Sequence, residues 1–131
     1  MRTETTVRAA MTAVSPFFIV RDVRRALAFY RDTLGFEVTY LAPDPDPFLA
    51  IVRRDGVQFL LKSVGVEATP NRTRHADARW DAYVHTPDPD ALAAELRDVP
   101  FSAPLSDTPD GLRGFELEDP DGHRLFFGRP R

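Results

Sequence analysis

Apolar and polar residues follow regular spacings in the first half of the chain, and these spacings predict one helix among four strands. Runs rich in aromatic and β-branched residues, or strictly alternating, favour strands. Apolar residues three and four apart after Asp22, a good N-cap, favour a helix that Gly35 ends. The expected elements are a strand over 16–20, a helix over 23–34 and strands over 36–40, 48–52 and 57–62.

The second half repeats this order after a long polar stretch. Asp88 is placed as an N-cap with Pro89 at the first helical position, and Pro100 ends that helix. The sequence Asp119-Pro120-Asp121-Gly122 predicts a hairpin turn. The expected elements are a strand over 80–85, a helix over 90–99 and a hairpin of strands over 115–118 and 124–128.

A constant offset of 66 residues relates the two halves. Asp22 corresponds to Asp88, and the turn at 55–56 corresponds to that at 121–122. We therefore predict an α+β fold built from two β-α-β-β-β modules. The expected segments are a flexible N-terminal tail over 1–14, a first module over 15–62, a linker over 63–79 and a second module over 80–131.

Composition narrows the function classes. The 131 residues carry a formal net charge of −3, which disfavours nucleic-acid binding because phosphate contacts need a basic face. The absence of cysteine excludes disulfides, thiolate metal sites and cysteine nucleophiles. No apolar run approaches the ~18 residues that a membrane span needs. We expect no nucleic-acid or membrane partner and a cytoplasmic location.

Several motifs together resemble the vicinal oxygen chelate superfamily, also called glyoxalase/bleomycin-resistance/dioxygenase proteins. The resemblance covers residues 15–130. It implies that the two modules form a curved mixed sheet with a concave cup and helices on its outer face. The motifs are Phe18-Ile19-Val20-Arg21-Asp22-Val23, Ala28-Phe29-Tyr30, Leu34-Gly35-Phe36 and the run 118–127 (EDPDGHRLFF).

The resemblance also implies where a metal would bind in metal-dependent members. The ligand positions are seven residues before each helix-capping Asp and four residues after each hairpin Gly. Here they hold Ser15, Asp81, Leu60 and Phe126. One carboxylate, one hydroxyl and two hydrocarbons do not supply the imidazole and carboxylate donors that Zn²⁺, Fe²⁺ or Mn²⁺ prefers. We therefore expect no metal and no cofactor.

Strand alternation separates a cup face from a core face. The core face is expected to hold Phe18, Val20, Phe59, Leu61, Val84, Leu125 and Phe127. The cup face mixes aromatic and polar side chains, as a small-molecule site requires. The candidate ligand-binding residues are Phe17, Ile19, Gln58, Leu60, Lys62, Trp80, Asp81, Tyr83, His85, Arg124 and Phe126.

Several of these candidates have simpler alternatives. Phe17, Leu60 and Phe126 could merely fill the cup, and Asp81 could form an ion pair with Arg124 or Lys62. Trp80 has core parity but could edge the pocket or a subunit interface. His85 is expected at a strand end on the surface and His123 in solvent. Asp119 and Asp121 are expected to make turn hydrogen bonds rather than to act as acid and base.

Three function hypotheses follow. The resemblance to the bleomycin-resistance branch implies a metal-free homodimer that sequesters a small, partly aromatic molecule without chemistry, contacted by Phe17, Tyr83 and Phe126, with Asp81 facing a cationic group. The second is a metal-dependent lyase or dioxygenase with non-standard ligands. The third is a metal-free isomerase or lyase with Asp81 or His85 as general base.

Overall fold

The first module builds one four-stranded sheet with a helix against it. The structure is a computed structural model and describes residues 7–131. Strand order is β1-β4-β3-β2, with β1 parallel to β4 and the other pairs antiparallel. The elements are β1 (Phe17–Ile19), α1 (Val23–Leu27), the π-helical turn η1 (Ala28–Thr33), β2 (Glu37–Ala42), β3 (Leu49–Arg54) and β4 (Val57–Lys62).

The second module repeats the arrangement with the sheet order β5-β8-β7-β6, in which β5 is parallel to β8. A short helix, α2 (Asn71–Arg74), lies between the modules in the segment predicted as a linker. The remaining elements are β5 (Ala82–His85), α3 (Pro89–Glu95), β6 (Phe101–Asp107), β7 (Leu112–Glu118) and β8 (Arg124–Pro130).

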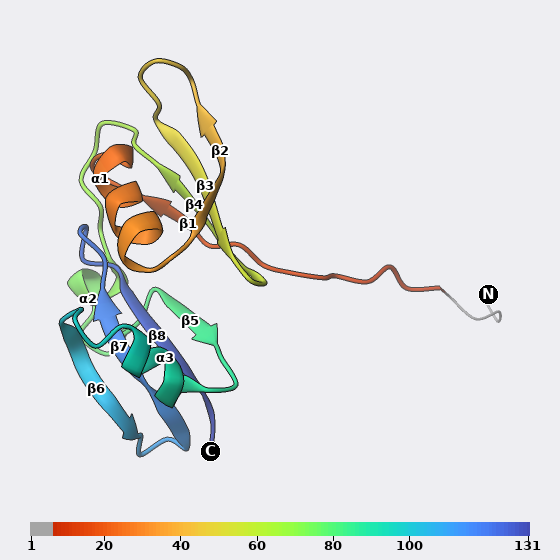
Figure 1. Ribbon diagram of the computed structural model, residues 1–131, viewed down its shortest axis with the longest axis vertical. Helices are drawn as coiled ribbons and strands as arrows, with labels where there is room; N and C mark the ends of the chain where they lie inside the picture. Colours follow the sequence, from red (N-terminus) through yellow and green to blue (C-terminus); the bar gives the residue numbers. More distant parts are fainter. Residues whose placement is uncertain (1–6) are drawn as a thin grey trace.

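The predicted α+β fold of two repeated modules is confirmed. Figure 1 shows them along the long axis, β1–β4 with α1 at one end and β5–β8 with α3 at the other. The strands form two separate four-stranded sheets rather than one continuous sheet. None of the helices found in residues 7–131 combines the length and the apolar character that crossing a bilayer requires.

The core faces of the strands are buried as predicted. Phe59 and Leu61 on β4 lie under α1, and Leu125 and Phe127 on β8 lie in the same continuous apolar core. This core includes side chains from both modules, so the two halves share one hydrophobic interior. The opposite face of each sheet is left for the candidate site.

Three elements differ from their predicted ranges in ways that matter here, and a fourth had no range. The first helix becomes π-helical after Leu27, where the Leu34 amide donates to the Phe29 carbonyl over five residues. The second helix ends at Glu95, four residues early. The strand β5 begins at Ala82 instead of residue 80. Strand β6 had no predicted range; its Pro104 is tolerated because β6 is an edge strand.

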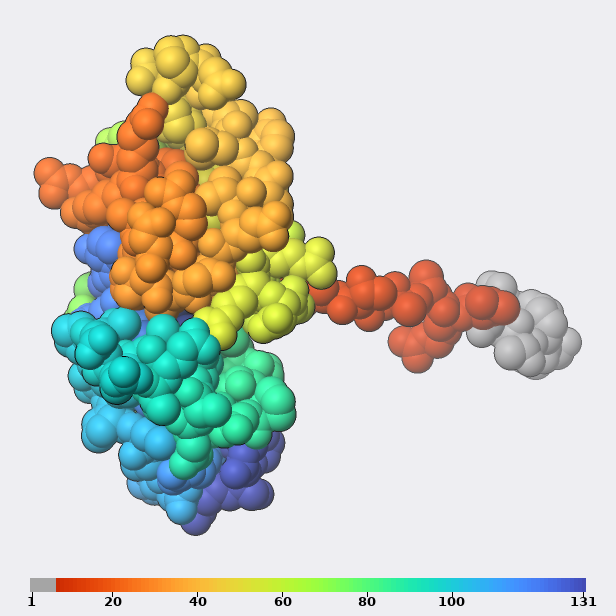
Figure 2. Space-filling model, in the orientation of Figure 1, coloured from red at the N-terminus to blue at the C-terminus, as the bar shows by residue number. Residues whose placement is uncertain are grey.

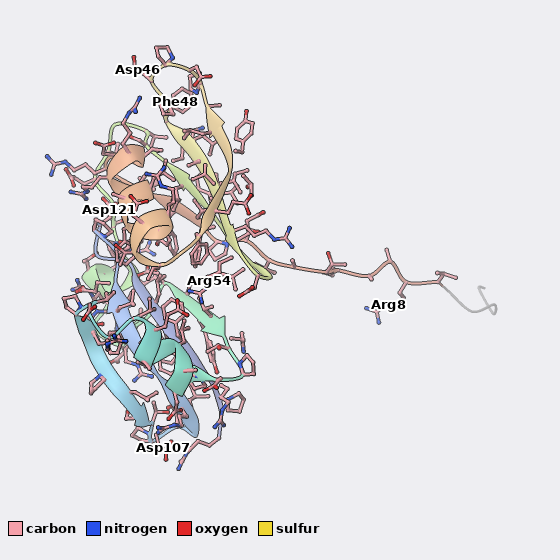
Figure 3. All side chains as sticks on the ribbon, viewed as in Figure 1. Arg8, Asp46, Phe48, Arg54, Asp107 and Asp121 are labelled. Atoms are coloured by element: carbon pink, nitrogen blue, oxygen red, sulfur yellow. The ribbon has the colours of Figure 1, made fainter. Side chains whose placement is uncertain are left out.

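The hairpin turn of each module contacts the helix of the other module. Arg54, at the end of β3, makes two 2.9 Å hydrogen bonds to the Glu95 carboxylate of α3. Asp121, in the β7–β8 turn, accepts from Arg25 of α1 at 2.9 Å and from the Arg21 amide at 2.9 Å. Figure 3 places Arg54 and Asp121 at the boundary between the modules. These two contacts fix the modules relative to each other.

The N-terminal segment up to residue 16 carries no regular structure where it is described. It runs away from the body of the protein as a narrow arm (Figure 2), with Val7, Met11 and Val14 exposed. Residues 1–6 of the expected tail lie outside the described residues. The flexibility expected of residues 1–14 stays a prediction.

Candidate functional site

Four side chains of the second module form an aromatic cluster, which we define as Trp80, Tyr83, His85 and Phe126. The Trp80 and Phe126 rings are stacked with centroids 4.2 Å apart. Tyr83 meets Phe126 edge-on at 5.2 Å and stacks on His85 at 4.1 Å. The parity argument placed Trp80 with the core. Its stacking on Phe126 puts it on the cup face instead.

Two glycines allow the Phe126 ring to lie flat on the sheet. Gly114 on β7 is directly paired with Gly128 on β8. A Cβ atom on either glycine would lie 2.5 Å from a Phe126 ring atom. Phe126 is therefore held between a bare patch of backbone and Trp80, and only 3% of it is exposed. Of the other three members, His85 is exposed, and Trp80 and Tyr83 are half-buried.

Glu116 is hydrogen-bonded to Trp80, and the sequence pattern did not identify it as a site residue. Its carboxylate accepts the indole N–H at 2.8 Å and the Ser102 hydroxyl at 2.7 Å. It also lies 3.5 Å from Arg124 Nη1. Counting outward from the β7–β8 turn pairs residue 116 with Phe126, so hairpin register could have placed it on the cup face. Glu116 fixes the orientation of the Trp80 ring.

The candidates of the first module form a more open surface. Phe17 is 56% exposed and Ile19 is 38% exposed, and Phe17 pairs in register with Leu60. Gln58 donates to the Ser15 hydroxyl at 3.0 Å. The Lys62 ammonium lies 5.7 Å from the centre of the Phe48 ring. This face presents apolar side chains with few polar groups.

Both carboxylate oxygens of Asp81 accept hydrogen bonds from backbone amides. One accepts from Asn71 and the other from Arg124, each at 2.9 Å. Within residues 7–131 Asp81 forms no ion pair, so the predicted pairing with Arg124 or Lys62 is wrong. Arg124 instead faces Glu116 and Glu118. Asp81 thus joins α2 to the start of β8, and its carboxylate keeps its negative charge.

Two cavities lie between the modules, and each is lined by some of the candidate ligand-binding residues. The larger, about 670 Å³, runs from the β3–β4 turn to β5 and α3, and its walls are mainly apolar; Gln58, Tyr83 and His85 line it. The smaller, about 360 Å³, lies beside β1 and α2; Phe17, Ile19 and Asp81 line it. The predicted site residues are thus spread over the aromatic cluster and two separate cavities, and Leu60, Lys62 and Arg124 belong to none of these.

His123 is buried, with 5% exposure, so its prediction as a solvent residue is wrong. Its Nδ1 lies 2.8 Å from Asp119 Oδ2, which also accepts the Tyr30 hydroxyl at 2.9 Å. Asp119 Oδ1 accepts the amides of Asp121 and His123, the turn hydrogen bonds expected from the sequence. The His123 ring stacks on Phe18 at 4.3 Å. This side-chain group joins the second hairpin to η1 and β1.

The charges around this group shift two pKa values. Burial, reinforced by the charge of Asp119, raises the pKa of Tyr30 well above its usual value. Burial alone would lower the pKa of His123, but the hydrogen bond and charge of Asp119 outweigh it and raise the pKa above 6.5. The tyrosine therefore stays a neutral donor to Asp119.

The raised pKa of His123 predicts a pH-dependent stability. Because the folded-state pKa exceeds that of the unfolded chain, about 6.5, the stabilisation is complete below that pH. It is lost as the pH rises through the folded-state value. We expect the free energy of unfolding in urea to fall over this interval in the wild type and to vary less in His123→Asn. An equal decline in both proteins would contradict the assignment.

The residues at the family's metal positions do not fit a divalent metal. Ser15 is bonded to Gln58, both oxygens of Asp81 are bonded to amides, and Leu60 and Phe126 have no donor atom. No three His, Asp or Glu side chains of the described part of the chain are grouped to hold an ion. No catalytic step is therefore derived through a metal.

Comparisons with known proteins identify the family. The family model described as "Glyoxalase/Bleomycin resistance protein/Dioxygenase superfamily" matches residues 10–127. No match was found among curated proteins.

Solved structures with the same fold include a bleomycin-binding protein from bleomycin-producing Streptomyces verticillus, in complex with copper(II)-bleomycin. It is 25% identical with a TM-score of 0.70, over 95% of this chain and 100% of that one. A superfamily member from Sphaerobacter thermophilus is 27% identical with a TM-score of 0.60, over 90% and 97%. The antibiotic-binding protein TnmS3 from Streptomyces sp. CB03234 is 23% identical with a TM-score of 0.65, over 95% and 100%. Together with the family match, the fold and the motifs, this similarity shows that the chain belongs to the glyoxalase/bleomycin resistance protein/dioxygenase superfamily.

Proposed function

We propose that the protein is a metal-free homodimer that binds a small, partly aromatic molecule and sequesters it without chemistry. The observation that carries this proposal is the aromatic cluster. Trp80 and Tyr83 are half-buried and held in place, Trp80 by Glu116 and Phe126. Rigid aromatic faces bind flat ligands at a low entropic cost because their orientation is fixed before binding.

The proposed ligand class is a flat, heteroaromatic antibiotic of the bleomycin type. The similarity to a bleomycin-binding protein supports this class. The state of Asp81 changes one part of the hypothesis, because its oxygens are already bonded to amides. We therefore assign recognition to stacking on Trp80 and Tyr83 rather than to a charge contact at Asp81.

A second copy of the chain is the proposed cover for the open face of the first module. Phe17, Ile19 and Phe48 are exposed there beyond what an isolated surface residue explains. A homodimer would bury them and enclose a ligand between the copies. We expect sedimentation of the free protein to show two chains per particle.

Titration with a bleomycin-type glycopeptide tests the function. Trp80 is the only tryptophan, so its fluorescence reports directly on the aromatic cluster. We expect saturable quenching in the wild type and at least about tenfold weaker binding by calorimetry in Trp80→Ala, corresponding to about 1.4 kcal/mol. The loss arises because the variant removes the largest aromatic side chain of the cluster.

Val66→Ala is the matched control, because Val66 is an exposed apolar residue in the loop after β4, outside the aromatic cluster. Its affinity should equal that of the wild type. The proposal is wrong if neither bleomycin nor other flat aromatic antibiotics change the Trp80 fluorescence. Equal affinity in Trp80→Ala would also contradict it.

A further inference from the structure

The smaller cavity between the modules is separate from the aromatic cluster. Its volume is about 360 Å³, the space of roughly a dozen water molecules. None of the four aromatic-cluster residues lines it. Its walls are Pro16, Phe17, Phe18 and Ile19 from β1 and the residue before it, Thr69, Asn71 and Arg74 around α2, and Asp81 and His123. One wall is thus apolar, and the facing wall is polar.

His123 is held in the polar wall of this cavity, and its Nε2 atom is available for a ligand. Its Nδ1 is engaged by Asp119 at 2.8 Å, and its ring lies flat on Phe18 at an angle of 6°. Within the described residues, Nε2 has no hydrogen-bond partner and is not among the buried polar atoms that lack one. Nε2 is therefore the polar atom that His123 offers to the cavity.

The second free donor is the guanidinium of Arg74. One nitrogen of this exposed side chain donates to the Asn71 side-chain oxygen at 2.7 Å, and its other N–H groups stay available. A guanidinium presents a fork of donors that matches a carboxylate. Arg74 and His123 come from different elements, so the cavity is a place where two donors converge.

The acidic groups near the cavity accept local hydrogen bonds but keep their charge, so Arg74 and protonated His123 must outweigh the carboxylate of Asp81, which lines the cavity. Both oxygens of Asp81 accept backbone amides. Asp119 faces His123 and Tyr30, and Asp121 is paired with Arg25 of α1. The hydrogen-bond donors that remain available are on the cationic side chains Arg74 and His123.

We propose that this cavity binds a small carboxylate, held between Nε2–H of His123 and the guanidinium of Arg74. The apolar wall of Phe17 and Ile19 then favours a carboxylate with a short hydrophobic body, such as an aromatic acid. Because Asp119 raises the pKa of His123, the imidazolium form that donates through both nitrogens persists to a higher pH. Binding should weaken at alkaline pH as that proton is lost.

Benzoate is the probe for the test, at constant ionic strength near pH 6. Imidazole nitrogen spectra of the full chain report on its three histidines separately. We expect a saturable shift of the His123 Nε2 signal, with no matching change at His85 in the aromatic cluster. Backbone amide shifts of Asn71 then give the affinity in variants that lack the imidazole.

Two variants and a control decide the outcome. His123→Asn keeps a side-chain N–H for Asp119 but removes Nε2, and Arg74→Gln removes the second cation. Each should weaken benzoate binding by at least about tenfold. Arg31→Gln, an exposed arginine paired with Asp32, should bind as the wild type does. Should His123→Asn fail to fold, Arg74→Gln on the exposed α2 still gives the answer.

The proposal is overturned if benzoate shifts no His123 signal, if the shifts are linear and equal in all variants, or if phosphate binds as well as benzoate. The last outcome would mean a general anion site without the apolar recognition argued here. Trp80 fluorescence stays the readout for the aromatic cluster, so failure of one site is distinguishable from failure of the other.

Discussion

Replacing Asp119 with alanine is expected to destabilise the protein by about 3–5 kcal/mol, the range for breaking a buried charged pair. The carboxylate is fully buried and has four partners, so its loss strands the Tyr30 hydroxyl, the His123 ring and two turn amides. Each stranded buried donor adds a desolvation cost. The measurement is urea unfolding near pH 6, where the His123 interaction is complete.

Two further variants are expected to destabilise the protein less than Asp119→Ala and serve as comparisons. Tyr30→Phe removes a single hydrogen bond to Asp119 and should cost about 1–2 kcal/mol. Asp32→Ala breaks only an exposed contact with Arg31 and should leave the stability close to that of the wild type. If Asp119→Ala proved no more damaging than Tyr30→Phe, the hairpin would not depend on this carboxylate.

Gly114→Ala should cost about 3 kcal/mol and disturb the aromatic cluster at the same time. The added methyl would collide with the Phe127 carbonyl oxygen and lie 2.5 Å from the Phe126 ring. Overpacking typically costs about 1–3 kcal/mol, and the upper end applies because backbone cannot move aside cheaply. Urea unfolding measures the loss, and Trp80 fluorescence should shift because Phe126 is pushed against its stacking partner.

Gly56→Ala is the matched control for this prediction. It lies in the β3–β4 turn, where an added Cβ would meet nothing within 4 Å. Its stability and Trp80 fluorescence should match those of the wild type. An unchanged fluorescence spectrum in Gly114→Ala would show that Phe126 does not need the bare backbone beneath it.

Strand position and strand face were predictable because they depend on local pattern. Alternation identified the core-facing side chains of β4 and β8, although Phe126 on the other face of β8 is buried as well, and the start and end of β4 match the predicted range 57–62. The repeat itself could be found because turn and cap chemistry constrain residue types strongly. Asp22 and Asp88 both cap their helices through the side chain, as expected.

The positions of the other site residues depend on tertiary contacts that cannot be predicted from local sequence patterns. His123 looks like a turn residue, and only the packing of β1 against the second hairpin brings Phe18 over its ring. Strand parity left the place of Trp80 open, and it is decided by Glu116, which accepts its indole N–H, and by Phe126, on which it stacks. Strand β6 had no predicted range, and its Pro104 is tolerated because β6 lies at the edge of the sheet, which is a tertiary property.

The reciprocal contacts between turns and helices have a consequence for assembly. Arg54 of the first turn reaches α3, and Asp121 of the second turn reaches α1. Two halves that each contribute the same element to the other have the self-complementary form of a two-fold homodimer. The segment 63–79 ties these halves together, so their effective concentration stays high however dilute the protein becomes. The two turns are nevertheless not equivalent, because the second carries a buried His–Asp pair that is hydrogen-bonded to Tyr30 of the first module.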